Sequence, residues 1–226
     1  MGVIAILEPP PRSAMLFAMV TDRRLPKEVQ MEALIVIDAQ NEFSARGLRP
    51  VPNHEAALAA IRELVAQARR ESRPIAWVRH LNRLEEWPAF EPGSWGAELS
   101  PGLGPQSGAG PEALFEKDVF GAFTGTGLEN WLRSLGVRAV QVAGFYAHMC
   151  VSTTVREALM CGFDVRIDPA TTGARDLEQE DLGRQTADEV SHTALLHLTN
   201  LGATLVRGTR ASETAGGRAA LLLWEP

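Results

Sequence analysis

Short apolar runs alternate along this chain with longer stretches in which apolar residues recur at helical spacing. Ala33–Ile37 is a continuous apolar run that ends at Asp38, and such a run is typical of a strand buried on both faces of a parallel sheet. Pro52 and Asn53 then open a stretch with apolar residues at intervals of three and four, up to Ala68. This spacing predicts an amphipathic helix with Asn53 as its N-cap.

The same two patterns alternate through the rest of the chain. They predict further strands at residues 75–78, 113–116, 137–143, 163–167 and 203–206, and helices at residues 127–135, 149–160 and 181–201. Strands that alternate with helices indicate an α/β fold, with a mostly parallel six-stranded sheet and helices on both faces. Residues 81–111 are rich in Gly and Pro and show little periodicity. A loop of this length is usually functional.

Composition and charge narrow the class of protein. The chain has 226 residues, of which 45% are hydrophobic and 22% charged, and its net charge is −6. These values favour a single globular domain and argue against a nucleic-acid partner. No apolar run is long enough to cross a membrane, and the early apolar residues lack the basic flank of a signal peptide. With only two cysteines, Cys150 and Cys161, we expect a cytoplasmic protein in a reducing compartment.

Three chemically distinctive residues fall at the carboxyl ends of predicted strands. Asp38 ends the first strand, Lys117 ends the third, and Cys150 follows the fourth at the start of a helix. Ligands of open parallel sheets bind at this edge. A thiol at a helix N-terminus near a lysine is expected to favour the thiolate. A nearby aspartate opposes the thiolate by its charge, but it can accept the thiol proton. Taken singly, the three could be a turn residue, a surface lysine and a buried filler; their convergence favours a hydrolase site.

Three strings extend this site, namely residues 35–43 (IVIDAQNEF), 116–123 (EKDVFGAF) and 144–158 (GFYAHMCVSTTVREA). In this order and spacing the chain resembles the isochorismatase-like cysteine hydrolases, which include isochorismatases, nicotinamidases and N-carbamoylsarcosine amidohydrolases. Weaker matches lie at residues 92–99 and 168–172. The resemblance covers about residues 30–206, so we expect one domain over residues 1–226, with an N-terminal arm (1–30) and a C-terminal tail (207–226) around this core.

The resemblance implies a three-layer, Rossmann-like α/β/α fold and a catalytic triad of Asp38, Lys117 and Cys150. It also implies a cis peptide between Phe145 and Tyr146 that would direct the backbone N–H groups of Tyr146 and Cys150 into an oxyanion hole. The expected activity is hydrolysis of a C–N bond in a small amide or carbamoyl compound through a Cys150 thioester.

Two departures from the family pattern keep alternatives open. Ala147 stands where amidase members often have Thr, and Val119 stands where many members have Arg. The segment 146–148 resembles true isochorismatases, which commonly lack the cysteine. A vinyl ether hydrolase that uses Asp38 as the acid is therefore one alternative, and a non-catalytic ligand-binding relative is another.

Residues near the three strand ends are expected to bind the substrate. Those proposed for this role are Gln40, Phe43, His80, Trp95, Phe120 and Tyr146. Nicotinamidases bind a metal through an Asp-x-His pair and another His, whereas the corresponding segment here, 77–82, holds only His80. We therefore expect no metal and no cofactor. Expected partners are a small-molecule substrate and, from the resemblance and the apolar pieces in both end segments, further copies of the chain in a homodimer or homotetramer, with no nucleic acid and no membrane.

Overall fold

A computed structural model of the chain describes residues 31–83, 88–108 and 110–207. The described residues belong to one compact unit, which begins at Met31. The expected N-terminal arm, the C-terminal tail beyond Arg207, and Trp87 lie outside the described residues. No described helix combines the length and the apolar character that a membrane span requires.

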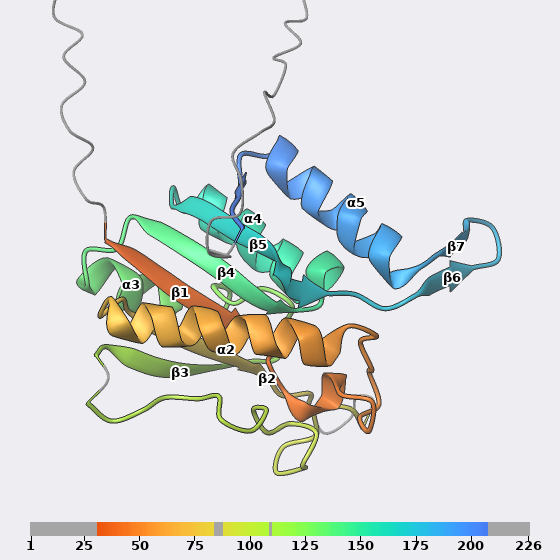
Figure 1. Cartoon of the computed structure of the whole chain (residues 1–226), viewed down its shortest axis with the longest axis horizontal. Coiled ribbons are helices and arrows are strands. Elements are labelled where there is room, and N and C mark those ends of the chain that lie inside the picture. The colour runs from red at the N-terminus through yellow and green to blue at the C-terminus, as the bar shows by residue number, and fades with distance from the viewer. Residues whose placement is uncertain (1–30, 84–87, 109, 208–226) are drawn as a thin grey trace, which may run out of the picture. The chain divides into compact units, whose positions relative to one another are not determined.

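A six-stranded sheet with strand order β3-β2-β1-β4-β5-β8 forms the centre of this unit (Figure 1). Its strands are β1 (Glu32–Ile37), β2 (Ile75–His80), β3 (Glu112–Lys117), β4 (Ala139–Phe145), β5 (Asp164–Gly173) and β8 (Thr204–Leu205). Every neighbouring pair is parallel. The sheet confirms the predicted α/β class, and the inner strands β1 and β4 are apolar because both of their faces are buried.

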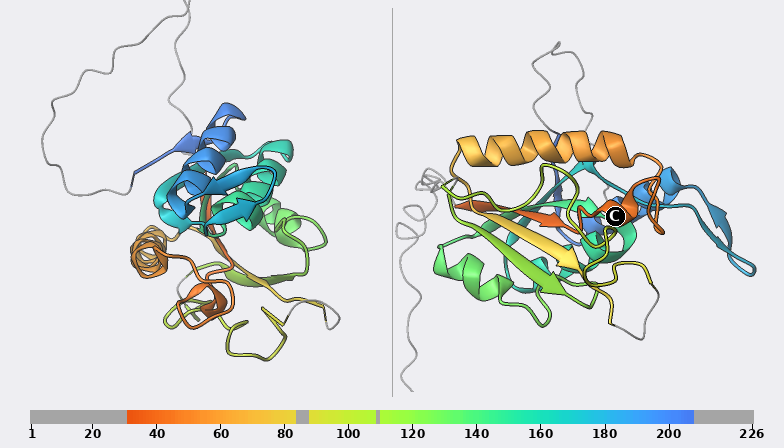
Figure 2. Two further views of the ribbon diagram at one scale, coloured as in Figure 1. Left: turned by 90° about the vertical axis from the view of Figure 1, so that its right-hand side faces the viewer. Right: turned by 90° about the horizontal axis from the view of Figure 1, so that it is seen from below.

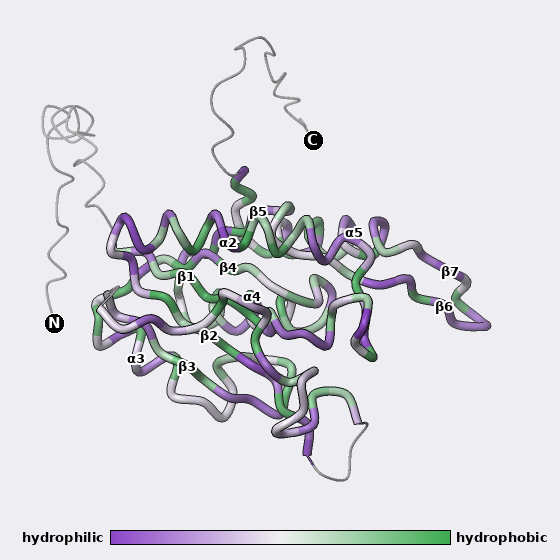
Figure 3. Tube along the Cα trace, turned by 60° about the horizontal axis from the view of Figure 1, so that its bottom comes forward, coloured by the Kyte–Doolittle hydropathy of each residue, from purple (hydrophilic) through white to green (hydrophobic). Residues whose placement is uncertain are grey.

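The helices lie on both faces of the sheet, as Figure 2 shows end-on. One face packs against α2 (His54–Arg70), while the opposite face packs against α3 (Leu128–Ser134), α4 (Ser152–Met160) and α5 (Ala187–Asn200). In Figure 3 the central strands are predominantly hydrophobic and the outer side of α2 is hydrophilic. Helix α2 begins directly after Asn53 as predicted, but the Asn53 amide donates to the Thr172 carbonyl (3.2 Å) instead of capping the helix.

The predicted helix at residues 181–201 is wrong over its first turn and a half. Residues Leu177–Gln179 (β6) and Gly183–Gln185 (β7) pair as an antiparallel hairpin that projects from the unit (Figure 1). Helix α5 begins after Thr186, whose hydroxyl accepts the Glu189 N–H while the Glu189 carboxylate accepts the Thr186 N–H. This capping box fixes the start of the helix.

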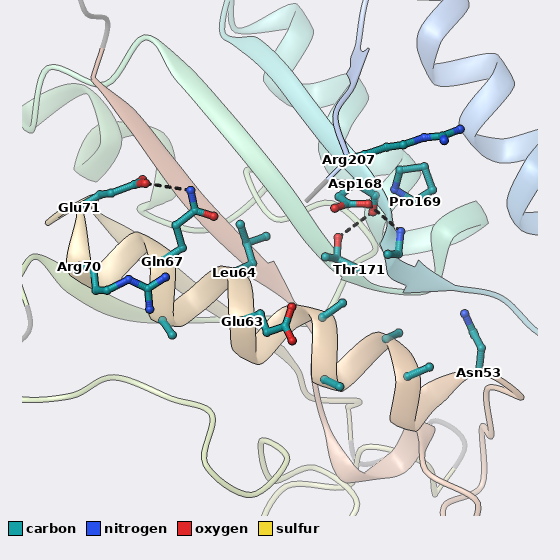
Figure 4. Close-up of a pocket in the computed structure, with 16 residues that line it drawn as sticks. Asn53, Glu63, Leu64, Gln67, Arg70, Glu71, Asp168, Pro169, Thr171 and Arg207 are labelled. Atoms are coloured by element: carbon teal, nitrogen blue, oxygen red, sulfur yellow. Dashed lines mark hydrogen bonds between the residues drawn. The ribbon is translucent and has the colours of Figure 1, made fainter. Parts of the chain in front are cut away.

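Strand β5 contains a bulge that shapes the sheet face beside α2. Between Val142 and Gly144 of β4, the partner residue in β5 advances from Ile167 to Thr172. Pro169 lies in this irregularity, where the lack of an N–H costs no ladder hydrogen bond. The bulge and α2 border a groove of about 1210 Å³, shown in Figure 4. None of the candidate site residues lines this groove.

Candidate active site

The three candidate catalytic residues meet at the carboxyl edge of the sheet. Asp38 follows β1, Lys117 is the last residue of β3, and Cys150 lies in a single π-helical turn, η2 (Ala147–Val151), directly after β4. The side chains of Asp38 and Lys117 are 1% and 0% exposed, and Cys150 is 7% exposed. The sequence-based placement of all three at one edge is therefore realised in the fold.

The backbone at the end of β1 turns sharply to direct Asp38 into the site. Asp38 has φ = 49°, in the left-handed region that few residues other than Gly adopt. Its N–H donates to the Val78 carbonyl of β2 (2.8 Å), and its own carbonyl accepts the Gln40 N–H (2.7 Å). These bonds hold the turn, so the Asp38 carboxylate points away from the line of the strand and toward the site at the carboxyl edge of the sheet.

Strand β4 approaches β1 more closely than a side chain would allow. A Cβ added to Gly144 would lie 1.8 Å from the Ile37 carbonyl oxygen, and Gly144 has φ = 125°. The peptide bond between Phe145 and Tyr146 is cis, as the resemblance implies. The chain then enters η2 and places Cys150 beside the end of β1. Single π turns within helices are frequent at functional sites.

Lys117 connects the acid and the thiol. Its Nζ donates to Asp38 Oδ2 at 2.8 Å and to Cys150 Sγ at 3.4 Å. Burial opposes the charge on Lys117, but Asp38 and Cys150 beside it outweigh that effect and raise its pKa above 10.5. Asp38 Oδ1 is buried and has no hydrogen-bond partner among the described residues. One carboxylate oxygen is thus occupied by the ammonium, and the other is available to a proton.

His80, proposed as a substrate-binding residue, also lies against Lys117. The Lys117 Nζ is 3.1 Å from His80 Nδ1, and His80 Nε2 is 2.8 Å from Asn82 Oδ1. An ammonium only donates, so Nδ1 accepts and Nε2 carries the hydrogen toward Asn82. The Asn82 amide in turn donates to the Ala89 carbonyl (2.7 Å). This chain of hydrogen bonds orients the His80 ring and holds the ammonium in place.

The structure corrects the expected thiolate at Cys150. Burial raises the pKa of the Cys150 thiol above 9.0, the negative charge of Asp38 adds to this effect, and Lys117 opposes it. Lys117 favours the thiolate and Asp38 opposes it, and the burial of the site, which the sequence does not display, decides the balance in favour of the thiol. At neutral pH the residue is therefore a thiol that needs a proton acceptor.

A pocket of about 310 Å³ opens onto these groups. Its size is at the lower end of the range for small-molecule sites. Aromatic rings form much of its wall: the Phe43 ring lies 4.8 Å from that of Tyr146, edge to face, and 5.2 Å from that of Phe90. The residues that line the pocket are Asp38, Phe43, Arg49, His80, Asn82, Ala89, Phe90, Phe120, Tyr146, Met149, Cys150 and Arg175.

Four of the six residues proposed to bind substrate line this pocket, namely Phe43, His80, Phe120 and Tyr146. The other two do not. The buried Gln40 amide donates to the carbonyls of His80 (2.9 Å) and Ala97 (2.8 Å), so it ties β2 to the long loop. Trp95 is 42% exposed, and the Arg46 guanidinium lies over its ring.

The sequence interpretation missed several lining residues, above all Arg49, Asn82 and Arg175. Arg175 comes two residues after β5, at the same carboxyl edge as the triad, so the rule that found Asp38 could have found it. Arg49 and Asn82 lie in loops, and no sequence signal marked them. Among the described residues, no group of three or more His, Cys, Asp or Glu side chains is arranged to hold a metal ion.

Comparisons with known proteins agree with this fold and site. The isochorismatase domain model matches residues 32–196. The secreted isochorismatase effector Isc1 of Verticillium dahliae is 33% identical over 177 residues, covering 78% of this chain and 88% of that protein. Nicotinamidase 3 of Arabidopsis thaliana is 32% identical over 155 residues, covering 64% and 74% of the two chains. The crystal structure of an isochorismatase from Pseudomonas putida has a TM-score of 0.72 and 30% identity, covering 88% of this chain and 97% of that one. The chain therefore belongs to the isochorismatase family and is a hydrolase of that family.

Proposed function

We propose that this hydrolase cleaves a C–N bond of a small amide or carbamoyl compound through a thioester on Cys150, without a metal. The observation that carries the proposal is that the two oxygens of the Asp38 carboxylate have different hydrogen-bond partners. Lys117 holds Oδ2, while the buried Oδ1 has no partner among the described residues and the Cys150 thiol lies beside the same ammonium. This arrangement supports a base and a nucleophile that act together.

The reaction then proceeds in two stages. Asp38 Oδ1 accepts the thiol proton as Sγ attacks the substrate carbonyl carbon, and a tetrahedral oxyanion forms. Asp38 returns that proton to the leaving nitrogen, the C–N bond breaks, and ammonia or an amine departs from the thioester. A water molecule gives a proton to Asp38 and attacks the thioester, and Asp38 returns the proton to the departing Sγ, which restores the thiol and releases the acid.

The raised pKa of Cys150 fits this order of events. A thiol that stays protonated until substrate arrives does not place two anions in one buried site, and proton transfer to Asp38 can coincide with attack. Asp38 and Lys117 form a neutral ion pair before each proton transfer, and that pair is restored each time Asp38 gives the proton up. We further propose that the N–H groups of Tyr146 and Cys150, which flank the turn after β4, stabilise the oxyanion.

The experiment is an amide panel, including nicotinamide and N-carbamoyl amino acids, with released ammonia as the readout. We expect Cys150→Ala and Asp38→Asn each to reduce turnover of an active substrate by at least about a thousandfold. The double variant should be little worse than either single variant, because nucleophile and base act as a unit. Cys161→Ala is the matched control and should retain activity, since Cys161 ends α4 outside the pocket lining.

Intact-protein mass spectrometry after rapid quenching provides an independent readout. An acyl adduct that is present in the wild type and in Cys161→Ala, and absent in Cys150→Ala, supports the thioester. If Cys150→Ala instead retains near-wild-type rates while Asp38→Asn does not, the thioester proposal fails and a route that uses Asp38 without the thiol, as expected of a vinyl ether hydrolase, becomes the better interpretation.

A further inference from the structure

The groove of about 1210 Å³ between α2 and the β5 bulge has apolar walls over part of its length. On the helix side it is lined by Ala56, Ala59 and Ala60, which are exposed or half-buried, and on the bulge side by Pro169 and Ala170 (Figure 4). The solvent side of an amphipathic helix ordinarily carries charged and polar side chains. These walls therefore suit an apolar partner.

The last described residue lies at this groove. Arg207 comes two residues after the end of β8, and it lines the groove on the bulge side, beside Asp168 and Pro169 (Figure 4). The chain that follows Arg207 therefore starts at the rim of the groove.

The sequence beyond Arg207 changes in character after residue 218. Residues 208–218 (GTRASETAGGR) contain no large apolar side chain, whereas Ala219–Trp224 (AALLLW) is continuously apolar. A contiguous run of three leucines and a tryptophan is seldom left in water on a protein surface. This run therefore requires an apolar surface to cover it.

The intervening residues are long enough to carry this run along the groove. Residues 208–218 can span at most about 36–40 Å, while α2, with 17 residues, is about 26 Å long. A segment that is tethered to the rim over this distance has an effective concentration of roughly millimolar at the groove. The chain's own segment is therefore favoured over the same segment of a second copy in dilute solution.

One charge on the helix wall can orient the segment. Glu63 lines the groove midway along α2, and it forms no ion pair with another described residue (Figure 4). Glu71, another acid of the groove, pairs with Arg73 (2.8 Å). Arg218 comes directly before the apolar run. A carboxylate on the wall and a guanidinium at the start of the run are complementary in charge.

The two halves of the helix wall differ in polarity. From Glu63 toward the start of α2 the groove is lined by Ala59 and Ala60, whereas toward the end of α2 it carries the polar side chains of Gln67 and Arg70. An apolar segment that is held at Glu63 therefore fits the half toward the start of the helix.

We propose that Ala219–Trp224 of the chain's own C-terminal segment fills this groove. Arg218 pairs with Glu63, and the run continues from there toward the start of α2, antiparallel to the helix, with its apolar side chains against Ala59 and Ala60. The groove is thus a docking surface for this segment, on the face of the sheet opposite α3, α4 and α5.

The first test is thiol crosslinking of the full chain, in a background in which Cys150 and Cys161 are replaced by Ala. Ala59→Cys and Ala220→Cys are introduced together and treated with a short thiol-to-thiol crosslinker, and the linked peptides are identified by mass spectrometry. We expect a crosslink within one copy of the chain.

The control pair combines Ala220→Cys with Leu201→Cys. Leu201 is 48% exposed and directly follows α5, on the other face of the sheet, so this pair should give little crosslink. No crosslink at Ala59, equal yields from the two pairs, or a crosslink that joins two copies would overturn the inference.

Reversal of the proposed ion pair is the second test. Glu63→Arg should lower the yield of the crosslink between positions 59 and 220 about twofold to fivefold, as expected for an exposed ion pair, and adding Arg218→Glu should restore it. The matched control is Glu180→Arg, which reverses the same charge at an exposed position in the β6–β7 hairpin and should leave the yield unchanged. An unchanged yield in Glu63→Arg, or no recovery in the double variant, would overturn the inference.

Removal of the segment provides a readout without new cysteines. Deletion of residues 219–226 should lower the melting temperature by about 2–8 °C, because the apolar contacts in the groove are lost. The loss should be the same at low and high protein concentration, since docking within one chain does not depend on it. An unchanged melting temperature, or a loss that depends on concentration, would count against docking of the chain's own segment.

Discussion

Replacing Lys117 by Met removes the cation from a fully buried ion pair and leaves the Asp38 carboxylate behind. Lys117 Nζ and Asp38 Oδ2 are 2.8 Å apart, with side chains 0% and 1% exposed. Breaking a buried pair by removing one partner costs about 3–5 kcal/mol. For a domain of this size, about 2–4 °C of melting temperature is lost per kcal/mol, so we expect a fall of about 6–20 °C.

The complete experiment is a double-mutant cycle. Lys117→Met, Asp38→Asn and the double variant are unfolded in urea, and the free energy of unfolding is extrapolated to water. Each single variant leaves one buried charge uncompensated, whereas the double variant leaves none. The double variant should therefore lose less stability than the sum of the single variants, by at least about 2 kcal/mol. Additive losses would refute the reasoning, because they would mean that the two charges do not stabilise each other.

A surface ion pair and the pH dependence serve as controls. Arg133 and Glu129, one helical turn apart on α3 and about 40% exposed, should show coupling of no more than about 0.5 kcal/mol. Because folding raises the pKa of Lys117 above 10.5, its contribution is fully present below that pH and is lost as the pH rises through the higher folded value. The advantage of the wild type over Lys117→Met should therefore persist from pH 7 to about pH 10 and shrink only above it.

Other predictions concern single features of the structure. The difference in absorbance near 240 nm between the wild type and Cys150→Ala should show no Cys150 thiolate below about pH 9, because burial raises the pKa of this thiol. Asp38→Asn should lower the pKa of Cys150. A thiolate present in the wild type at pH 7 would contradict the effect of burial. Gly144→Ala should destabilise the protein by more than about 4 kcal/mol, or prevent folding, because the new methyl group meets the β1 backbone; a melting temperature within a few degrees of the wild type would show that no such close approach exists. Burial opposes the charge on Glu112, but hydrogen bonds from Arg69 and Trp77 outweigh it and lower the pKa of Glu112 from 4.5. Glu112→Gln should therefore reduce the free energy of unfolding by about 1–3 kcal/mol at pH 7. The difference in stability between the wild type and this variant should fade as the pH drops below about 4.5. An equal loss at pH 3 would contradict that linkage.

The apolar patterns predicted the sheet well because its strands are buried on both faces. The run Ala33–Ile37 and the observed β1 differ by one residue, and the triad followed from where such runs end. Patterns failed where tertiary contacts decide the structure. The β6–β7 hairpin has strands of only three residues each, with a single apolar side chain, Leu177, so they give no alternating signal. The Thr186 capping box then marks where α5 begins.

The residues that meet at the carboxyl edge of the sheet were predictable, but their protonation was not. Sequence position gave Asp38, Lys117 and Cys150, yet the pKa of the thiol depends on burial and on how close Asp38 lies, neither of which a sequence displays. Gln40 illustrates the same limit: two residues after Asp38 in the chain, it turns its amide toward the backbone of β2 and the long loop. Arg175 was overlooked for the opposite reason, since its strand end carried no motif that drew attention to it.

The separation of the triad in the sequence also has a consequence for folding. The hydrogen bonds that Lys117 makes to Asp38 and to Cys150 span 79 and 33 residues, and β1 must be paired on both sides before the three groups can meet. Contacts between such distant segments carry a large loop-closure cost and form late. No fragment that lacks β1, β3 or β4 can assemble the site, so during refolding the return of activity should coincide with the slowest structural phase and never precede it.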